Sequence, residues 1–167
     1  MEELTKPQFT RKMARDFTFR LLFAKTFVPD EDADRFYKNE LEGLFEMWAQ
    51  EQTPPYDGVE FGSETDYVKK VYFGVLDNID DIDARISAAA VGWSLSRLAK
   101  GVLTIMRLCV YEMTSLDDVP KRVALNEAVE LAKKYDDDSA PAFVNGVLNS
   151  IAKSLPDREC DAPRSKA

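Results

Sequence analysis

Apolar residues recur at steps of three and four along most of the chain. In residues 10–27, for example, the stripe consists of Met13, Phe17, Leu21 and Ala24. Such steps place side chains on one face of an α-helix, whereas a half-buried strand alternates at every second residue. Because no segment shows that alternation, the sequence predicts an all-α fold of six to seven helices.

The predicted helices are separated by short breaks. We expect them at about residues 10–27, 32–50, 64–91, 99–113, 125–135 and 141–155. The segment 99–113 is apolar nearly all round, which predicts the central helix of the core. Prolines and glycines in residues 51–63 indicate an exposed loop, and the polar residues 156–167 are expected to form a disordered tail.

The stretch Phe143 to Leu148, FVNGVL, contains an Asn-Gly pair, which between alternating residues would indicate a hairpin. Its flanks instead keep helical spacing, so the pair is predicted to lie inside a helix, where glycine costs about 1 kcal/mol relative to alanine. We expect structural roles for both residues. Gly146 would admit a neighbouring helix, because it has no Cβ, and Asn145 would hydrogen-bond a loop backbone.

Composition excludes several classes of site. The 167 residues include no histidine, which removes histidine bases and imidazole-dependent metal centres. Asp80, Asp81 and Asp83 and the run Asp136–Asp138 lack the spacing of a calcium loop and are interpreted as solvated helix caps. We therefore expect no catalytic residue, no metal and no cofactor. No apolar run is long enough to cross a membrane, and no signal core is present, so we expect a cytoplasmic protein.

Charge is distributed unevenly. The net charge is −8, which argues against general affinity for nucleic acid, yet residues 1–25 carry a local positive surplus. Cations and aromatic rings on one helix suit single-stranded RNA, because guanidinium groups meet phosphates and rings stack on bases. The candidate RNA-binding residues are Arg11, Lys12, Arg15, Phe19, Arg20 and Phe23. The alternative is a solvated basic helix end.

Two charged residues lie in the predicted central helix. Arg107 and Glu112 interrupt its apolar sequence and are expected to satisfy buried polar groups rather than to catalyse a reaction.

The last third of the chain resembles a known family. VPKRVALNEAVELAKKYDDDSAPAFVNGVLNSI is similar to the C-terminal signature of the NusB family of bacterial transcription antitermination factors. MRLCVYEM resembles the Leu-Arg-x-x-x-Tyr-Glu-Leu helix of the family through Arg107, Tyr111 and Glu112. ARDFTFRLLF resembles its N-terminal helix more loosely. The resemblance covers about residues 10–155, with the proline-rich loop 51–63 as a variable insertion.

The resemblance implies one domain, residues 1–155, made of two packed helical subdomains at about 10–92 and 93–155. It also implies a non-enzymatic role. In this family, an arginine-rich N-terminal helix contacts RNA. The protein would bind boxA-type single-stranded RNA together with NusE, a small-subunit ribosomal protein. In the transcription elongation complex, that assembly promotes read-through of ribosomal RNA operons.

Departures from the family pattern leave alternatives open. Met13 replaces a usual arginine, Arg20 a glutamine and Phe23 a tyrosine. Val102 and Leu103 replace an acidic and a basic residue, so they either form an apolar partner surface or turn into the core. One alternative is a divergent protein-binding or homodimeric module that no longer binds RNA. Another is the helical domain of an RNA cytosine methyltransferase, if the sequence is a fragment.

Overall fold

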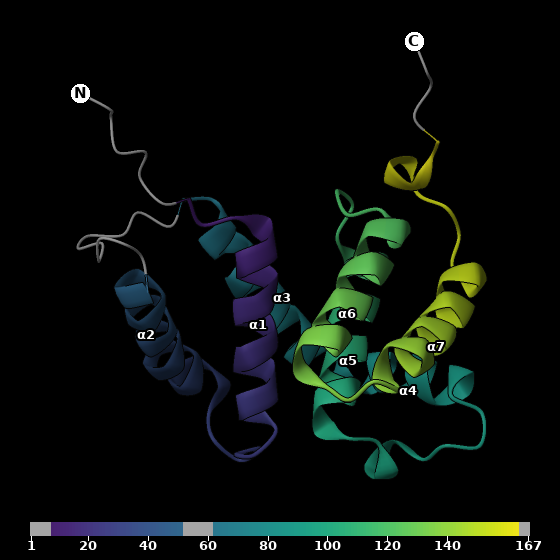
Figure 1. The fold of residues 1–167 in the computed structure, drawn as a ribbon, viewed down its shortest axis with the longest axis horizontal. Coiled ribbons are helices and arrows are strands. Elements are labelled where there is room, and N and C mark those ends of the chain that lie inside the picture. The colour runs from purple at the N-terminus through teal and green to yellow at the C-terminus, as the bar shows by residue number, and fades with distance from the viewer. Residues whose placement is uncertain (1–7, 52–61, 164–167) are drawn as a thin grey trace. The chain divides into compact units, whose positions relative to one another are not determined.

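The computed structural model describes residues 8–51 and 62–163, which form seven α-helices and two 3₁₀ turns without any strand (Figure 1). The prediction of an all-α fold is therefore confirmed. The elements are α1 (Arg11–Lys25), α2 (Ala33–Glu51), α3 (Glu64–Asp77), α4 (Ile79–Ala89), η1 (Leu95–Arg97), α5 (Lys100–Ser115), α6 (Lys121–Tyr135), α7 (Ala140–Ser154) and η2 (Glu159–Asp161). Most of the predicted loop 51–63, residues 52–61, lies outside the described residues.

The chain divides into two compact units, Met1–Tyr72 and Phe73–Ala167, with the boundary between them inside α3. The single helix predicted for residues 64–91 is wrong, because α3 ends one residue before Asn78 and α4 begins one residue after it. The Asn78 side-chain amide donates a 2.8 Å hydrogen bond to the Gly74 carbonyl. The Gly74 carbonyl also accepts the backbone N–H of Asn78 at 3.1 Å, and the break is confined to Asn78, whose φ of −114° and ψ of 18° depart from helical values.

Aromatic side chains form the core of the first unit. Phe9 lies edge-on to Phe17, Phe45 and Trp48, with ring centroids separated by 5.1, 5.5 and 5.8 Å. This cluster joins the segment before α1 to α1 and α2. The rings exclude water from both helices, and burying each ring stabilises the unit by roughly 2–3 kcal/mol.

In the second unit, α5 is the central helix, and α4, α6 and α7 pack against it. Eleven of its sixteen residues are buried, which confirms the prediction for its nearly continuous apolar sequence. Val102 and Leu103 are among them, so both turn inward. α6 and α7 lie side by side (Figure 1).

The acidic run between α6 and α7 caps a helix, as predicted. Asp137 Oδ1 accepts hydrogen bonds from the Ser139 hydroxyl at 2.7 Å and from the backbone N–H groups of Ser139 and Ala140 at 3.0 and 3.1 Å. These bonds, above all those from Ser139, hold the pKa of Asp137 below its usual value. The carboxylate thus satisfies N–H groups that α7 leaves free at its first turn.

The tail predicted to be disordered from residue 156 is ordered as far as residue 163. Arg158 donates from Nη1 to the Leu116 carbonyl at 2.5 Å and from Nη2 to the Val119 carbonyl at 2.6 Å. Asp161 accepts a 2.8 Å bond from the backbone N–H of Lys121, at the start of α6. The tail therefore caps the end of α5 and the start of α6, a role that its polar composition does not reveal. Residues 164–167 lie outside the described part.

Candidate nucleic-acid interface

The candidate RNA-binding residues all lie on α1. Thr10 caps this helix by accepting a 3.2 Å hydrogen bond from the Met13 N–H, which fixes the helix start one residue before the first cation. Lys12 is exposed and has no ion-pair partner among the described residues. It is therefore the candidate cation most open to a ligand.

The two arginines of the predicted basic face make contacts within the first unit. Arg11 Nε lies 2.6 Å from Glu64 Oε2 on α3, and its guanidinium lies 4.4 Å from the centre of the Tyr67 ring. Arg15 is only 4% exposed, with its guanidinium 5.8 Å from the same ring. Helical spacing places Arg15 opposite the apolar stripe of α1, but Tyr67 from α3 packs on that side as well. Of these two arginines, only Arg11 keeps a partly exposed side chain, at 36%.

The aromatic candidates differ in exposure. Phe19 is 3% exposed and stacks on Phe23 at 5.8 Å between ring centroids, whereas Phe23 is half-buried. Phe27, one turn further, lies edge-on to Phe23 at 5.1 Å and is exposed. Sequence reasoning missed Phe27 as a candidate, although its four-residue step from Phe23 was a usable signal.

Arg20 is the last of the predicted cations. Its Nη2 lies 3.2 Å from Asp16 Oδ2 one turn earlier, and about a third of its side chain is exposed. The Asp16 side chain is only 14% exposed, so the pair is partly buried, and Arg20 offers a phosphate only the exposed part of its side chain.

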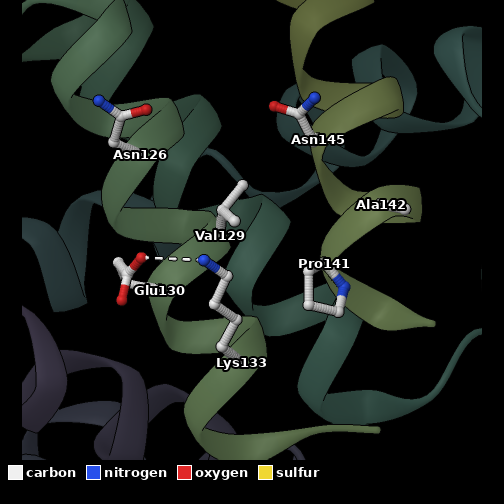
Figure 2. Close-up of a pocket in the computed structure, with 7 residues that line it drawn as sticks. All are labelled: Asn126, Val129, Glu130, Lys133, Pro141, Ala142 and Asn145. Carbon is white, nitrogen blue, oxygen red and sulfur yellow. Dashed lines mark hydrogen bonds and ion pairs between the residues drawn. The ribbon is translucent and has the colours of Figure 1, made fainter. Parts of the chain in front are cut away.

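The residues Asn145 and Gly146 are not placed as predicted, although they do lie inside helix α7. A Cβ on Gly146 would meet no atom within 4 Å, so no neighbouring helix approaches there. Asn145 is exposed and hydrogen-bonds no loop backbone among the described residues. It lines a groove of about 530 Å³ between α6 and α7, opposite Asn126 (Figure 2). The structural roles expected for this pair are wrong, because both residues face outward.

The other two residues with an expected structural role, Arg107 and Glu112, lie on α5 in the second unit. Arg107 Nε and Nη2 donate to the two carboxylate oxygens of Asp83 on α4, each at 2.8 Å. Glu112 is fully buried. The two bonds match the planar guanidinium of Arg107 to the carboxylate of Asp83 and join α4 to α5.

Within residues 8–51 and 62–163, no group of three or more cysteine, aspartate or glutamate side chains is arranged to hold a metal ion. None of the described helices combines the length and the apolar character needed to span a membrane.

These observations define an all-helical protein with a short cationic edge on α1 and a polar groove on the α6–α7 pair. Comparison with known proteins gives its family. The sequence model of the NusB family matches residues 11–153, and the chain belongs to that family.

The relatives are similar over nearly their whole length. The transcription antitermination protein NusB of Clostridium botulinum is 37% identical over 84% of this chain and 98% of that protein. NusB of Geobacter sulfurreducens is 33% identical over 89% of this chain and 97% of that protein. These names describe antitermination proteins, which agrees with the prediction that the chain is not an enzyme.

Solved structures support the same family. A structure of T. maritima NusB matches with a TM-score of 0.73 and 30% identity, covering 88% of this chain and 93% of that one. A chain from a crystal structure of the antitermination factors NusB and NusE with double-stranded RNA matches with a TM-score of 0.71. It is 28% identical and covers 87% of this chain and 97% of that one.

Proposed function

We propose that this chain is a transcription antitermination factor that binds RNA jointly with NusE. The observation that carries the proposal is its membership of the NusB family, together with its similarity to a chain solved with NusE and RNA. The acidic net charge of −8 suits a basic partner protein, since opposite potentials speed and orient association.

In the proposed mechanism, α1 supplies the contact to the RNA. Lys12 and the exposed part of Arg11 meet phosphates, and the half-buried Phe23 and exposed Phe27 offer ring surface to unpaired bases. So few cations give weak binding by the chain alone. Binding of NusE adds further contacts to the same RNA, so each ligand strengthens the binding of the other.

The specific target in this proposal is boxA-type single-stranded RNA in the transcripts of ribosomal RNA operons. The result of this binding would be read-through by the transcription elongation complex. The RNA target and the read-through both extend the role of the family to this chain.

A second function is favoured by the contacts of the arginines. Arg11 is paired with Glu64 and Arg15 is buried, so α1 presents less free positive charge than the sequence indicates. A protein-binding or homodimeric module without RNA binding fits that observation.

One titration separates the two functions. Labelled boxA-type and scrambled RNA would be titrated with the chain, with and without NusE, at low and moderate salt. The antitermination proposal expects tighter binding of the boxA-type RNA in the presence of NusE and weaker binding at higher salt. Equal affinity for both RNAs in every mixture, with self-association by sedimentation, supports the homodimeric module instead.

A further inference from the structure

One aromatic ring of α3 lies beside two arginines of α1, all within the first unit. The guanidinium of Arg11 lies over the Tyr67 ring, 4.4 Å from its centre, and that of Arg15 lies 5.8 Å from the same centre. Tyr67 and Arg15 are only 5% and 4% exposed, so neither offers much surface to a ligand. Arg11, one helical turn before Arg15, is the member of this group that meets solvent.

Glu64, the first residue of α3, completes the surroundings of Arg11. Its Oε2 accepts a 2.6 Å hydrogen bond from Arg11 Nε, so a carboxylate meets the edge of the guanidinium while the ring of Tyr67 covers a face. The Glu64 side chain is 23% exposed, which leaves the pair open to solvent. Carboxylates and phosphates both present charged oxygen acceptors to a guanidinium. Glu64 therefore occupies the kind of position that a phosphate oxygen of RNA would take.

The contact between Arg11 and the ring is compatible with a change of anion. A cation–π contact uses the face of a guanidinium, whereas its five N–H donors point outward in the plane. The ion pair with Glu64 runs through Nε, one of these in-plane donors. A phosphate can thus replace the carboxylate at the edge of the guanidinium while the contact to Tyr67 stays as it is.

The ring also reduces what RNA binding costs at Arg11. Fixing a long arginine side chain in one orientation loses rotamer freedom, and that loss weakens binding when it occurs in the complex. In this protein the Arg11 guanidinium is already held by Tyr67 and Glu64. Lys12, by contrast, is exposed and makes no ion pair with a described residue, so RNA itself would have to order it.

We propose that Tyr67 is a positioning residue for the RNA contact of α1: its ring holds the Arg11 guanidinium in place while an RNA phosphate displaces Glu64. This role rests on the RNA binding proposed above, and Tyr67 itself does not touch the RNA. Because one anion replaces another at Arg11, the net gain from this contact is small, which suits weak binding by the chain alone.

The role of the ring is tested by titrating boxA-type RNA, in the presence of NusE, with the wild type, Tyr67→Phe and Tyr67→Leu. Tyr67→Phe keeps a ring under Arg11 and should bind RNA nearly as tightly as the wild type. Tyr67→Leu loses the cation–π contact, so RNA affinity should fall about two- to tenfold. The slope of log affinity against log salt concentration should become shallower by up to about 0.7, since one phosphate contact is weakened.

A matched control is the same substitution at another ring that lies beside a cation. The ring of Tyr135, at the end of α6, has the Lys134 Nζ 5.1 Å from its centre. Tyr135→Leu should leave RNA affinity and its salt dependence unchanged.

The Arg11→Ala background separates positioning from general packing. If Tyr67 acts through Arg11, adding Tyr67→Leu to Arg11→Ala should cost no further RNA affinity. An equal loss in both backgrounds would mean that the ring acts through the fold of the first unit, and would overturn the proposal. Unchanged affinity of Tyr67→Leu, or an equal loss in Tyr67→Phe, would overturn it as well.

A measurement on the wild-type chain does not depend on how the variants fold. In NMR spectra recorded while RNA and NusE are added, the Arg11 Nε–H signal should stay protected from exchange, and the Glu64 carboxylate signal should shift. A Glu64 signal that does not move at saturating RNA contradicts the displacement. Absence of RNA binding by the wild type in every mixture is a different result, because it removes the proposed function and, with it, the role of Tyr67.

Discussion

The ring of Tyr111 on α5 occupies the space that a side chain on Gly74 of α3 would need. A Cβ built on Gly74 would overlap Cζ and the hydroxyl oxygen of that ring. The two residues lie in the same unit, and the glycine lets the ring lie directly on the backbone of α3. Burial, and then the charge of Asp77, raise the pKa of the Tyr111 phenol, so this residue stays neutral as it packs. The close approach expected at Gly146 is thus found at Gly74.

Gly74→Ala should destabilise the protein by about 1–3 kcal/mol. Alanine improves helix propensity by roughly 1 kcal/mol, but overlap of its methyl group with a ring fixed in the core exceeds that gain. Urea unfolding would measure the difference. Gly43→Ala in α2 is the matched control, because a Cβ there meets nothing within 4 Å and the variant should be as stable as the wild type or more stable. Destabilisation of both variants to the same extent would contradict the role assigned to Tyr111.

Gly146→Ala should raise the free energy of unfolding by about 0.5–1 kcal/mol. The position is helical, its φ is not positive, and the new methyl group enters open space, so only the entropic cost of glycine is removed. Thermal unfolding followed by circular dichroism would show the rise in Tm. A fall in Tm would mean that a neighbour approaches Gly146 after all, and would restore the packing role first expected for it.

The sequence predicted what depends on periodicity and missed what depends on a partner from another helix. The nearly continuous apolar run of α5 correctly indicated a buried central helix, because a helix that is packed on most sides has apolar residues at most of its positions. Arg15 was expected on an exposed face, since the spacing within α1 cannot reveal that Tyr67 of α3 lies beside it. For the same reason, nothing in the polar tail indicated that Arg158 would cap α5.

The sequence analysis also missed the break between α3 and α4. Ile79, Ile82 and Ile86 continue the helical spacing of the preceding segment across Asn78, so periodicity alone favours one helix. The break is a departure of Asn78 alone from helical φ and ψ, and its side-chain amide bonds the Gly74 carbonyl one turn earlier. A residue that both suits a helix end and tolerates a helix interior leaves such a boundary undecided until the fold is known.

Arg107→Ala should destabilise the second unit by roughly 2–3 kcal/mol. The Arg107–Asp83 pair has side chains only 16% and 24% exposed, so removing the arginine leaves a half-buried carboxylate without its two bonds. The double variant Arg107→Ala, Asp83→Ala should be less destabilised than the sum of the two single variants. Urea unfolding of all four proteins gives this coupling energy, and strict additivity would show that the pair contributes nothing of its own.

Asp161→Asn should destabilise the protein at neutral pH and have less effect in acid. Burial raises the pKa of Asp161, but bonds from the N–H groups of Lys121 and Arg158, together with the charges of these residues, outweigh it and hold the pKa below its usual value. The ionised form therefore stabilises the fold above a pH of about 4, and that contribution is lost as the pH falls through the lowered pKa.

The measurement for Asp161 is urea unfolding of wild type and variant at several pH values from neutral to acid. We expect a difference of about 1–2 kcal/mol at neutral pH that narrows below pH ~4. Asp157→Asn is the matched control, because its carboxylate is 86% exposed although it also lies near Lys121. A constant difference across the whole pH range would contradict the assignment to the charged carboxylate.

Glu64→Gln and Lys12→Ala should change RNA affinity in opposite directions. Glu64 holds Arg11 through a 2.6 Å ion pair, so neutralising it frees a partly exposed guanidinium for phosphate and should tighten RNA binding about two- to fivefold. Lys12→Ala removes an exposed cation, so binding should weaken by a similar factor. The slope of log affinity against log salt concentration should become shallower by roughly 0.7.

Fluorescence anisotropy with boxA-type RNA and NusE would measure both effects. Glu46→Gln, which removes one negative charge from an exposed position of α2, controls for net charge. If Glu64→Gln and Glu46→Gln raise the affinity equally, long-range charge explains the gain, and Arg11 has no specific role in holding the RNA.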